Sequence, residues 1–333
     1  MSVELVIVII LALVFDFVNG FHDAANAIAT TVSTRALSPR NAILLARTMN
    51  FLGAIASSAV AYTIGKGVID ISGHPNSMGL VLMALVGAIG WDLITWYWGL
   101  PSSSTHALVG GLLGVGLIAI GTDCLVWSGI LKILLAMVLS PILGIVVGII
   151  FTSVFYWLFR FAHPAKAHRN FRIAQIGSAT CMSFSHGMND AQNAMGIITL
   201  ALLAGNHLTE FHVPLWVKIA CALAMGAGTS AGGWKIIKTM GQRLVALKPI
   251  DGFAAELSSG SVIFGMSMIG APISTTHVIS TSIMGTGAAK SITAVRWNMV
   301  RRIVWAWILT IPGAAIIGGG CWWMRTLIEG FFR

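Results

Sequence analysis

Charged residues are scarce in this chain. Of its 333 residues only 9% are Asp, Glu, Lys or Arg, whereas 56% are hydrophobic. A soluble surface needs roughly a quarter of charged residues, so this composition excludes a soluble protein and indicates a polytopic membrane protein. The net charge of +9 would favour nucleic acid as a partner in a soluble domain, but here the Lys and Arg cluster between apolar runs, as orientation signals do. We therefore expect no nucleic-acid partner.

Cysteine motifs, paired histidines and alternating patterns are also missing. The four cysteines show no C-x-x-C spacing, which favours small core residues over a redox or metal site. No two His lie at metal-ligand spacing with a matching acid, so we expect neither a bound metal nor a cofactor. The alternation of barrel strands is absent, while Gly, Ala and Ser are frequent in the apolar runs, which is typical of closely packed membrane helices.

One short polar element occurs twice within the apolar runs. Its copies span residues 20–27 and 187–194, about half the chain length apart, which indicates an internal duplication. Both copies carry a glycine, an aspartate and an asparagine at matching places: Gly20, Asp23 and Asn26, then Gly187, Asp190 and Asn193.

The two aspartates of this element are costly to bury. An Asp at membrane depth costs roughly 3 kcal/mol on insertion scales, so such residues normally face a cavity and mark a pathway. A single acid could instead be hydrated near a helix end, but Asp23 and Asp190 are duplicated together with an Asn three residues later, which favours a functional role. We expect both aspartates to serve a cation, and the glycines to relax the backbone so that carbonyls face it.

A second element spans residues 101–106 and recurs at 272–277, each copy beginning with Pro, ending with His and carrying hydroxyl residues between. This pattern predicts a helix that begins inside the protein with Ser or Thr at its N-cap. Free N–H groups and hydroxyls there make an anion site without Lys or Arg, plain capping being the alternative. The candidates for anion binding are Ser103, Ser104 and Thr105, and Ser274, Thr275 and Thr276, with His106, His277 and Gln192 in secondary roles.

Basic residues gather in four short segments that set the expected topology: 35–47, 160–172, 235–248 and 290–302. These segments mark the cytoplasmic face, which places both termini outside. The first half then crosses an odd number of times, so the two halves have opposite orientation. This is the inverted repeat of a secondary transporter, with alternating access to a site near the midplane.

We therefore predict an all-α polytopic membrane protein of two inverted-topology repeats with broken or re-entrant helices and about 10–12 transmembrane segments. The first repeat covers residues 1–159, a basic connector 160–172, and the second repeat 173–333. The segments around Pro101 and Pro272 are either full spans or re-entrant hairpins.

An anion site whose nearby fixed charges are two aspartates makes sense if cations or protons enter with the anion. They neutralise the negative charge of the anion and the aspartates in a low-dielectric cavity. Cation-coupled symport follows as a hypothesis, with a passive anion channel as the alternative. A carboxylate acceptor favours an oxyanion that still carries O–H, which phosphate does near pH 7 and sulfate does not. A hydrolase built on Ser103, His106 and Asp92 or Asp23 is disfavoured, since no G-x-S-x-G elbow is present and an enzyme needs no second copy.

At these residues the chain resembles the inorganic phosphate transporter (PiT) family, whose hallmark is the paired G-x-x-D-x-x-N and P-x-S-[ST]-T-H elements found here. The resemblance spans nearly the whole chain. It implies that the protein is a transporter rather than an enzyme and that it moves phosphate by symport with H⁺ or Na⁺. It also implies that the protein forms a homodimer. It also implies that Asp23 and Asp190 couple the cation while Asn26, Asn193 and the motif hydroxyls bind phosphate.

Two further expectations come from this resemblance. Many eukaryotic members carry an acidic residue near the place of Asn50, so we expect coupling to H⁺ rather than Na⁺. The large cytoplasmic domain that some relatives insert between the halves is absent, and this compactness favours a prokaryotic inner membrane. Bacterial members often carry phosphate as a neutral complex with a divalent metal, and the family also contains sulfate permeases, which keeps sulfate as the alternative substrate.

Overall fold

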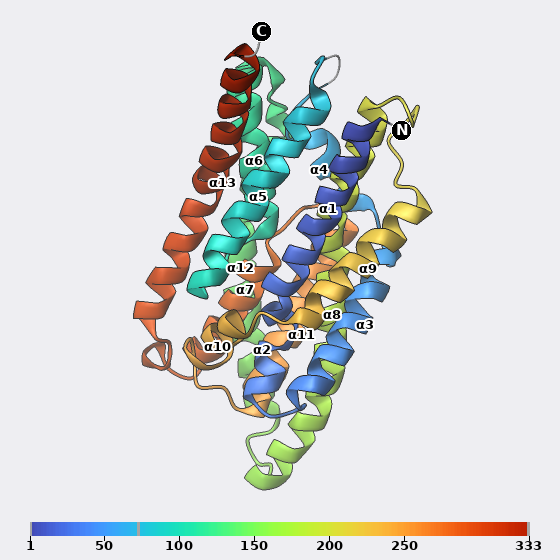
Figure 1. The fold of residues 1–333 in the computed structure, drawn as a ribbon. Coiled ribbons are helices and arrows are strands. Elements are labelled where there is room, and N and C mark those ends of the chain that lie inside the picture. Colours follow the sequence, from blue (N-terminus) through green and yellow to red (C-terminus); the bar gives the residue numbers. More distant parts are fainter. Residues whose placement is uncertain (1, 72–73, 332–333) are drawn as a thin grey trace.

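The computed structural model describes residues 2–71 and 74–331. Within these ranges the chain folds into thirteen α-helices and two single-turn 3₁₀ helices, with one isolated β-bridge between Ile69 and Leu125 (Figure 1). The predicted all-α class is therefore confirmed.

The two halves contain matching series of helices, with α8 in the second half in the place of α1 and α2 in the first. The first half has α1 (Val3–His22), α2 (Ala24–Ser33), α3 (Pro39–Ala56), α4 (Ala59–Gly67), α5 (Ser77–Trp98), α6 (Ser104–Ala119), η1 (Thr122–Cys124) and α7 (Trp127–Leu158). The second half has α8 (Pro164–Ala204), α9 (Leu215–Ala231), α10 (Trp234–Gln242), α11 (Pro249–Met268), α12 (Thr275–Ala288), η2 (Ile292–Ala294) and α13 (Trp297–Phe331). The pairs α3–α4 and α9–α10 are each bent by 72°. The duplication seen in two short elements thus extends along the whole chain.

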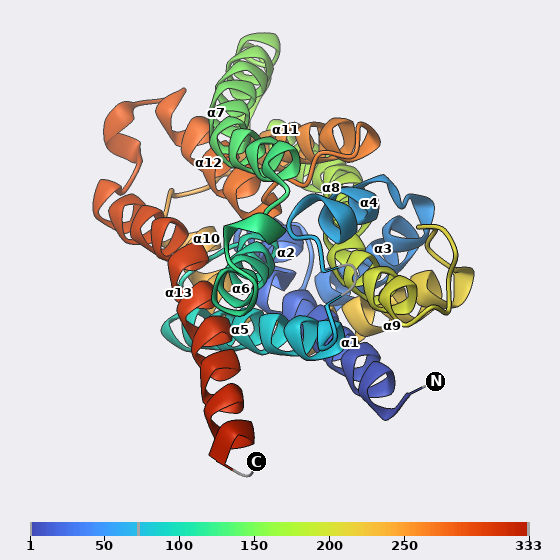
Figure 2. The same cartoon turned by 90° about the horizontal axis from the view of Figure 1, so that it is seen from above.

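The apolar helices suit a lipid environment. In the described residues four helical segments are long and apolar enough to cross a membrane, with α1 and α2 taken together as one of them, or up to six if each bent pair counts as one span. Only 28% of the apolar window of α7 and 33% of that of α13 is buried in the protein, and both helices lie at the edge of the bundle (Figure 2). These two helices therefore offer their apolar side chains to lipid.

Two hairpins, α5–α6 and α11–α12, turn back inside the bundle. Each turns at a glycine with left-handed backbone, Gly99 at φ 66° and Gly270 at φ 67°, a conformation that favours glycine. Residues 101–112 and 270–287 beyond these turns are buried without interruption. The buried tips favour the re-entrant reading of the Pro101 and Pro272 segments over two full spans.

The ends of the helices also agree with the predicted repeat. The start of α1 and the end of α13 lie at the same end of the bundle, and the connection from α7 to α8 lies at the opposite end (Figure 1). The chain from α1 to α13 therefore crosses from one end of the bundle to the other an even number of times. Which end faces the cytoplasm stays a prediction from the basic segments.

The prediction that both motif glycines relax the backbone is wrong for Gly187. A break between α1 and α2 does occur, at Asp23, but α8 continues without interruption past Gly187. A side chain at Gly20 would strike the carbonyl of Met225, and one at Gly187 the carbonyl of Asn50. Both glycines therefore allow close packing of helices rather than relaxing the backbone.

Candidate functional site

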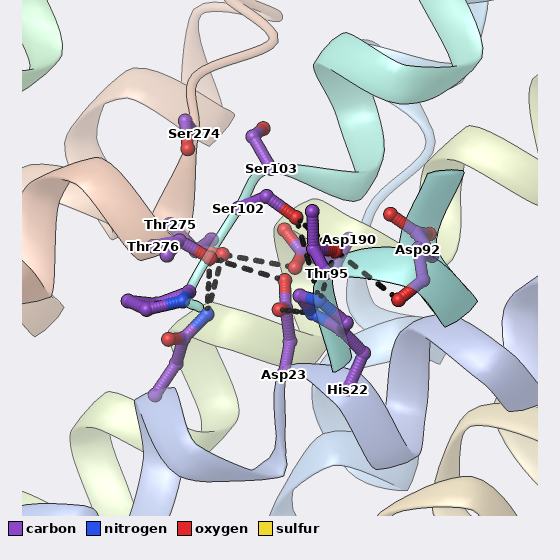
Figure 3. Close-up of polar contacts among 12 residues, drawn as sticks. His22, Asp23, Asp92, Thr95, Ser102, Ser103, Asp190, Ser274, Thr275 and Thr276 are labelled. Carbon is purple, nitrogen blue, oxygen red and sulfur yellow. Dashed lines mark hydrogen bonds and ion pairs between the residues drawn. The ribbon is translucent and has the colours of Figure 1, made fainter. Parts of the chain in front are cut away.

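Four elements meet in the interior of the bundle: the break between α1 and α2, the middle of α8, and the tips of the two hairpins (Figure 3). They bring together most of the residues that the sequence predicts. None of Asp23, Asn26, Asp190 and Asn193 is more than 2% exposed. The structure therefore places the paired polar elements in one closed site between the two repeats.

The asparagines of this site contact the hairpin of the opposite repeat. The amide of Asn26 donates to the hydroxyl of Thr276 at 2.9 Å and to that of Thr275 at 3.3 Å. The amide of Asn193 donates to the hydroxyl of Thr105 at 2.8 Å. Each Asn thus donates to the hydroxyl at the matching place of the other half. The side-chain carbonyl oxygen of each Asn has no hydrogen-bond partner among the described residues.

The two aspartates accept hydrogen bonds from the α11–α12 hairpin. Thr276 donates to Asp23 at 3.3 Å and Thr275 to Asp190 at 2.9 Å. Asn189 also donates to Asp190, at 2.8 Å. The carboxylates from the two repeats therefore share one set of hydroxyl donors.

His186 flanks the second Asp motif and is not among the site residues that the sequence predicts, but it completes a cluster with the two aspartates. One ligand atom each from Asp23, His186 and Asp190 lies within 4.8 Å of the others, and the His186 Nε2 is 3.2 Å from the Asp190 carboxylate. Two carboxylate oxygens and a ring nitrogen can bind a cation. The available signal was the spacing of four residues between His186 and Asp190, which places both on one face of a helix.

A second set of missed residues surrounds Asp23. The His22 Nδ1 lies 2.6 Å from the Asp23 carboxylate, and its Nε2 lies 3.1 Å from the hydroxyl of Thr95. Thr95 in turn pairs with Ser102 at 2.8 Å. His22 was visible beside its Asp, but no sequence signal marks Thr95, which reaches the site from α5 only through the fold.

The hydroxyls at the hairpin tips divide into two roles. Ser103 accepts from the N–H of His106 at 3.3 Å, and Ser274 from that of His277 at 3.1 Å, so both are N-caps, as predicted. Both lie apart from the carboxylates in Figure 3. Thr105, Thr275 and Thr276 contact the asparagines and aspartates directly, as described above, while the Ser104 hydroxyl has no partner among the described residues.

The three residues predicted in secondary roles lie at the border of the site. The Gln192 side chain accepts from the N–H groups of Val60 and Ala61 at 2.7 and 3.0 Å, so it caps α4. The rings of His106 and His277 are buried, and none of their nitrogens has a hydrogen-bond partner among the described residues. The ring of His106 therefore does not pair with Ser103, as the hydrolase alternative would need.

Chemically, the site offers donors for an anion and acceptors for a cation. Amides, hydroxyls and the capped starts of α6 and α12 can donate to an oxyanion. The buried carboxylates of Asp23 and Asp190 are negative when ionised, and no Lys or Arg is among the hydrogen-bond or ion-pair partners that the described residues give them. An anion bound here is stabilised only if positive charge enters with it.

The chain is similar to known transporters over almost its full length. Residues 19–318 match the family described as "Phosphate transporter family". The chain is 47% identical over 324 residues to the "Probable low-affinity inorganic phosphate transporter" of Bacillus subtilis, which covers 97% of both chains. It is 44% identical to the protein of that name from Rhizobium meliloti, again over 97% of both chains. A solved structure titled "The sodium-dependent phosphate transporter" matches with a TM-score of 0.87 at 28% identity, covering 98% of this chain and 100% of that one.

Proposed function

Since the chain belongs to the phosphate transporter family, we propose that it imports inorganic phosphate across a cytoplasmic membrane by symport with a cation. The observation that carries this proposal is the pairing of Asn26 with Thr276 and of Asn193 with Thr105 across the two repeats. A site built from two inverted halves can open to either end when one half moves against the other.

The donors and acceptors divide between the two solutes. Phosphate binds the amides of Asn26 and Asn193, the threonine hydroxyls of the hairpin tips and the free N–H groups of α6 and α12. Asp23 and Asp190 hold the coupled cation, and a carboxylate oxygen accepts the O–H that phosphate retains. Sulfate lacks this O–H group, which is why it ranks second.

For the coupled cation we propose H⁺ in preference to Na⁺. Asn50 lies beside the cluster, with its carbonyl oxygen 3.2 Å from the Nδ1 of His186. An acidic side chain at this place would add a third carboxylate to the cluster, and a neutral amide reduces the positive charge that must enter with phosphate. The residues present suit transfer of a proton between carboxyl groups.

A second candidate is co-transport of phosphate with a divalent metal as cargo. The cluster of Asp23, His186 and Asp190 favours it, because its ligand atoms lie within 4.8 Å of one another and include oxygen and imidazole donors. In this case the neutral metal–phosphate complex carries its own charge compensation.

Further parts of the proposal concern the setting. We place the protein in a prokaryotic inner membrane with both termini outside and expect a homodimer. The basic segments support the orientation, and the exposed apolar faces of α7 and α13 support contact with lipid or a second copy.

The proposal is tested by uptake of labelled phosphate into proteoliposomes. An inward proton gradient, an inward sodium gradient and added Mg²⁺ are imposed separately, with excess sulfate as competitor and Asp23→Asn and Asp190→Asn as variants. Accumulation against the phosphate gradient that needs both aspartates supports symport, and the effective gradient names the ion. Flux that is only downhill supports a channel, and flux that sulfate blocks supports a sulfate permease.

A further inference from the structure

Helix α1 carries two buried polar side chains between its start and the central site. Asp16 and Asn19 are both 0% exposed. Neither carboxylate oxygen of Asp16 and neither amide atom of Asn19 has a hydrogen-bond partner among the described residues. Unpaired buried groups of this kind are expensive, and a buried carboxylate needs a positive partner.

These side chains are in line with the central cluster. Asp16, Asn19 and Asp23 follow one another at spacings of three and four residues, which puts them on one face of a helix. At a rise of about 1.5 Å per residue, Asp16 lies about 10 Å from Asp23 along α1. Because α1 runs from the end that carries the termini towards the site (Figure 1), Asp16 stands on the side of that end.

The charge environment of Asp16 is negative. Its carboxyl interacts electrostatically with the carboxyl of Asp190 in α8, and α1 packs against that helix. A cation at Asp16 therefore also feels the carboxylate of Asp190 when that group is ionised.

The inverted repeat supplies an internal comparison. The places of Asp16 and Asn19 in α1 correspond to Ser183 and His186 in α8, at the same distances before Asp190. Ser183 is fully buried, and its hydroxyl has no hydrogen-bond partner in the described residues. The two polar rows thus lead from the central site towards opposite ends of the molecule, and only the row in α1 carries a carboxylate outside the central cluster.

We propose that Asp16 and Asn19 form a second cation site, which receives the coupling cation from the end of the termini before it reaches Asp23 and Asp190. This inference rests on the proposed symport. The carboxylate concentrates the cation on the entry side and so speeds loading of the central site, whereas the equivalent place in α8 holds the neutral Ser183. The gradients of the solutes still set the direction of net transport.

The test compares Asp16→Asn with wild-type protein in proteoliposomes of known orientation. The half-saturating concentration of Na⁺ at constant pH, and of H⁺ without Na⁺, is measured from each side. Addition from the side of the termini should need about tenfold more of the coupling cation in Asp16→Asn, which corresponds to about 1.4 kcal/mol of binding. Addition from the opposite side, and the phosphate KM at saturating cation, should not change.

Two variants serve as controls. Asp16→Glu keeps the carboxylate and should restore the cation dependence of the wild type. Thr152→Val in α7 removes another buried and unpaired polar group and should leave it unchanged. An unchanged half-saturating concentration from the side of the termini in Asp16→Asn, or the same loss from both sides, would overturn the second site.

A measurement without phosphate separates this inference from the proposed function. Purified wild-type protein in detergent should gain thermal stability on addition of the coupling cation, and Asp16→Asn should lose part of that gain. If wild type transports no phosphate but Asp16→Asn still weakens the cation effect, the proposed function fails and the second site stands. If the cation stabilises both proteins equally, the second site is refuted.

Discussion

His106 and His277 lie against each other, with ring centroids 4.9 Å apart and ring planes at 68°. They hold the same place in the two copies of one element. Two equivalent residues that touch must lie on either side of the axis that relates the halves, so this contact marks where the pseudo-twofold axis crosses the protein. The hairpin tips therefore meet at the axis itself, with the asparagine pairs on either side of it.

The first prediction concerns these cross-repeat pairs. Asn26→Ala and Asn193→Ala each remove a donor to a hairpin hydroxyl and should each raise the KM for phosphate about tenfold, since a buried hydrogen-bond partner is lost. Uptake in proteoliposomes measures this, with the exposed Asn298→Ala as control. An effect from one half only would contradict a site shared between the repeats. A double-mutant cycle of Asn193→Ala with Thr105→Val should show coupling of about 0.5–3 kcal/mol.

The second prediction concerns helix packing at Gly187. Gly187→Ala places a methyl group against the backbone of Asn50, and it should destabilise the protein by about 1–3 kcal/mol because backbone cannot move aside cheaply. Thermal unfolding in detergent measures the loss. Gly177→Ala on the same helix meets nothing within 4 Å, and it should be neutral or slightly stabilising since Ala is the better helix former. Equal unfolding temperatures for the two variants would contradict the packing role.

The third prediction concerns Glu256, a carboxylate that is 0% exposed in α11. It accepts hydrogen bonds from four side chains of α2 and α8 at distances from 2.5 to 2.8 Å: Thr30, Thr31, Gln175 and Ser178. Glu256→Ala leaves these donors unpaired and should cost about 3 kcal/mol or more in stability. The exposed pair of Arg325 with Glu329 gives the control, because Glu329→Ala should change stability by less than about 1 kcal/mol.

The fourth prediction separates transport from hydrolysis. Ser103→Ala and Ser274→Ala each remove an N-cap and should each cost about 1 kcal/mol in stability. Both should lower phosphate uptake, because the capped helix starts shape the site from the two sides. A hydrolase with Ser103 as nucleophile would instead lose all activity in Ser103→Ala and none in Ser274→Ala.

Much of this site was predictable because duplicated polar residues in apolar runs have few structural explanations. The starts of α6 and α12 were predictable from the order of Pro and hydroxyl residues, which is local chemistry. The break at Asp23 was not, since Gly187 and Asp190 repeat the same local sequence and α8 is continuous there. Tertiary packing decides between the two outcomes, and it is not encoded in the motif.

Other members of the site escaped prediction because they come from distant segments. Thr95 and Ser102 reach His22 only through the packing of α5 on α1. Glu256, which lies outside the site, is likewise a single acid without a counterpart in the first half, so the duplication gave no reason to select it. A comparison of the two halves identifies the residues that both halves share, but it does not identify residues that occur in one half only.

The single break between α1 and α2 has a consequence for the transport cycle. The first half is interrupted at the depth of the central site, and the second half is crossed there by the continuous helix α8 of 41 residues. If the two halves exchange their conformations, the resulting structure is therefore not equivalent to the original one. Under the proposed alternating access, the states open to the two sides of the membrane must then differ in free energy even without solutes or a membrane potential, and the empty carrier has a preferred resting direction.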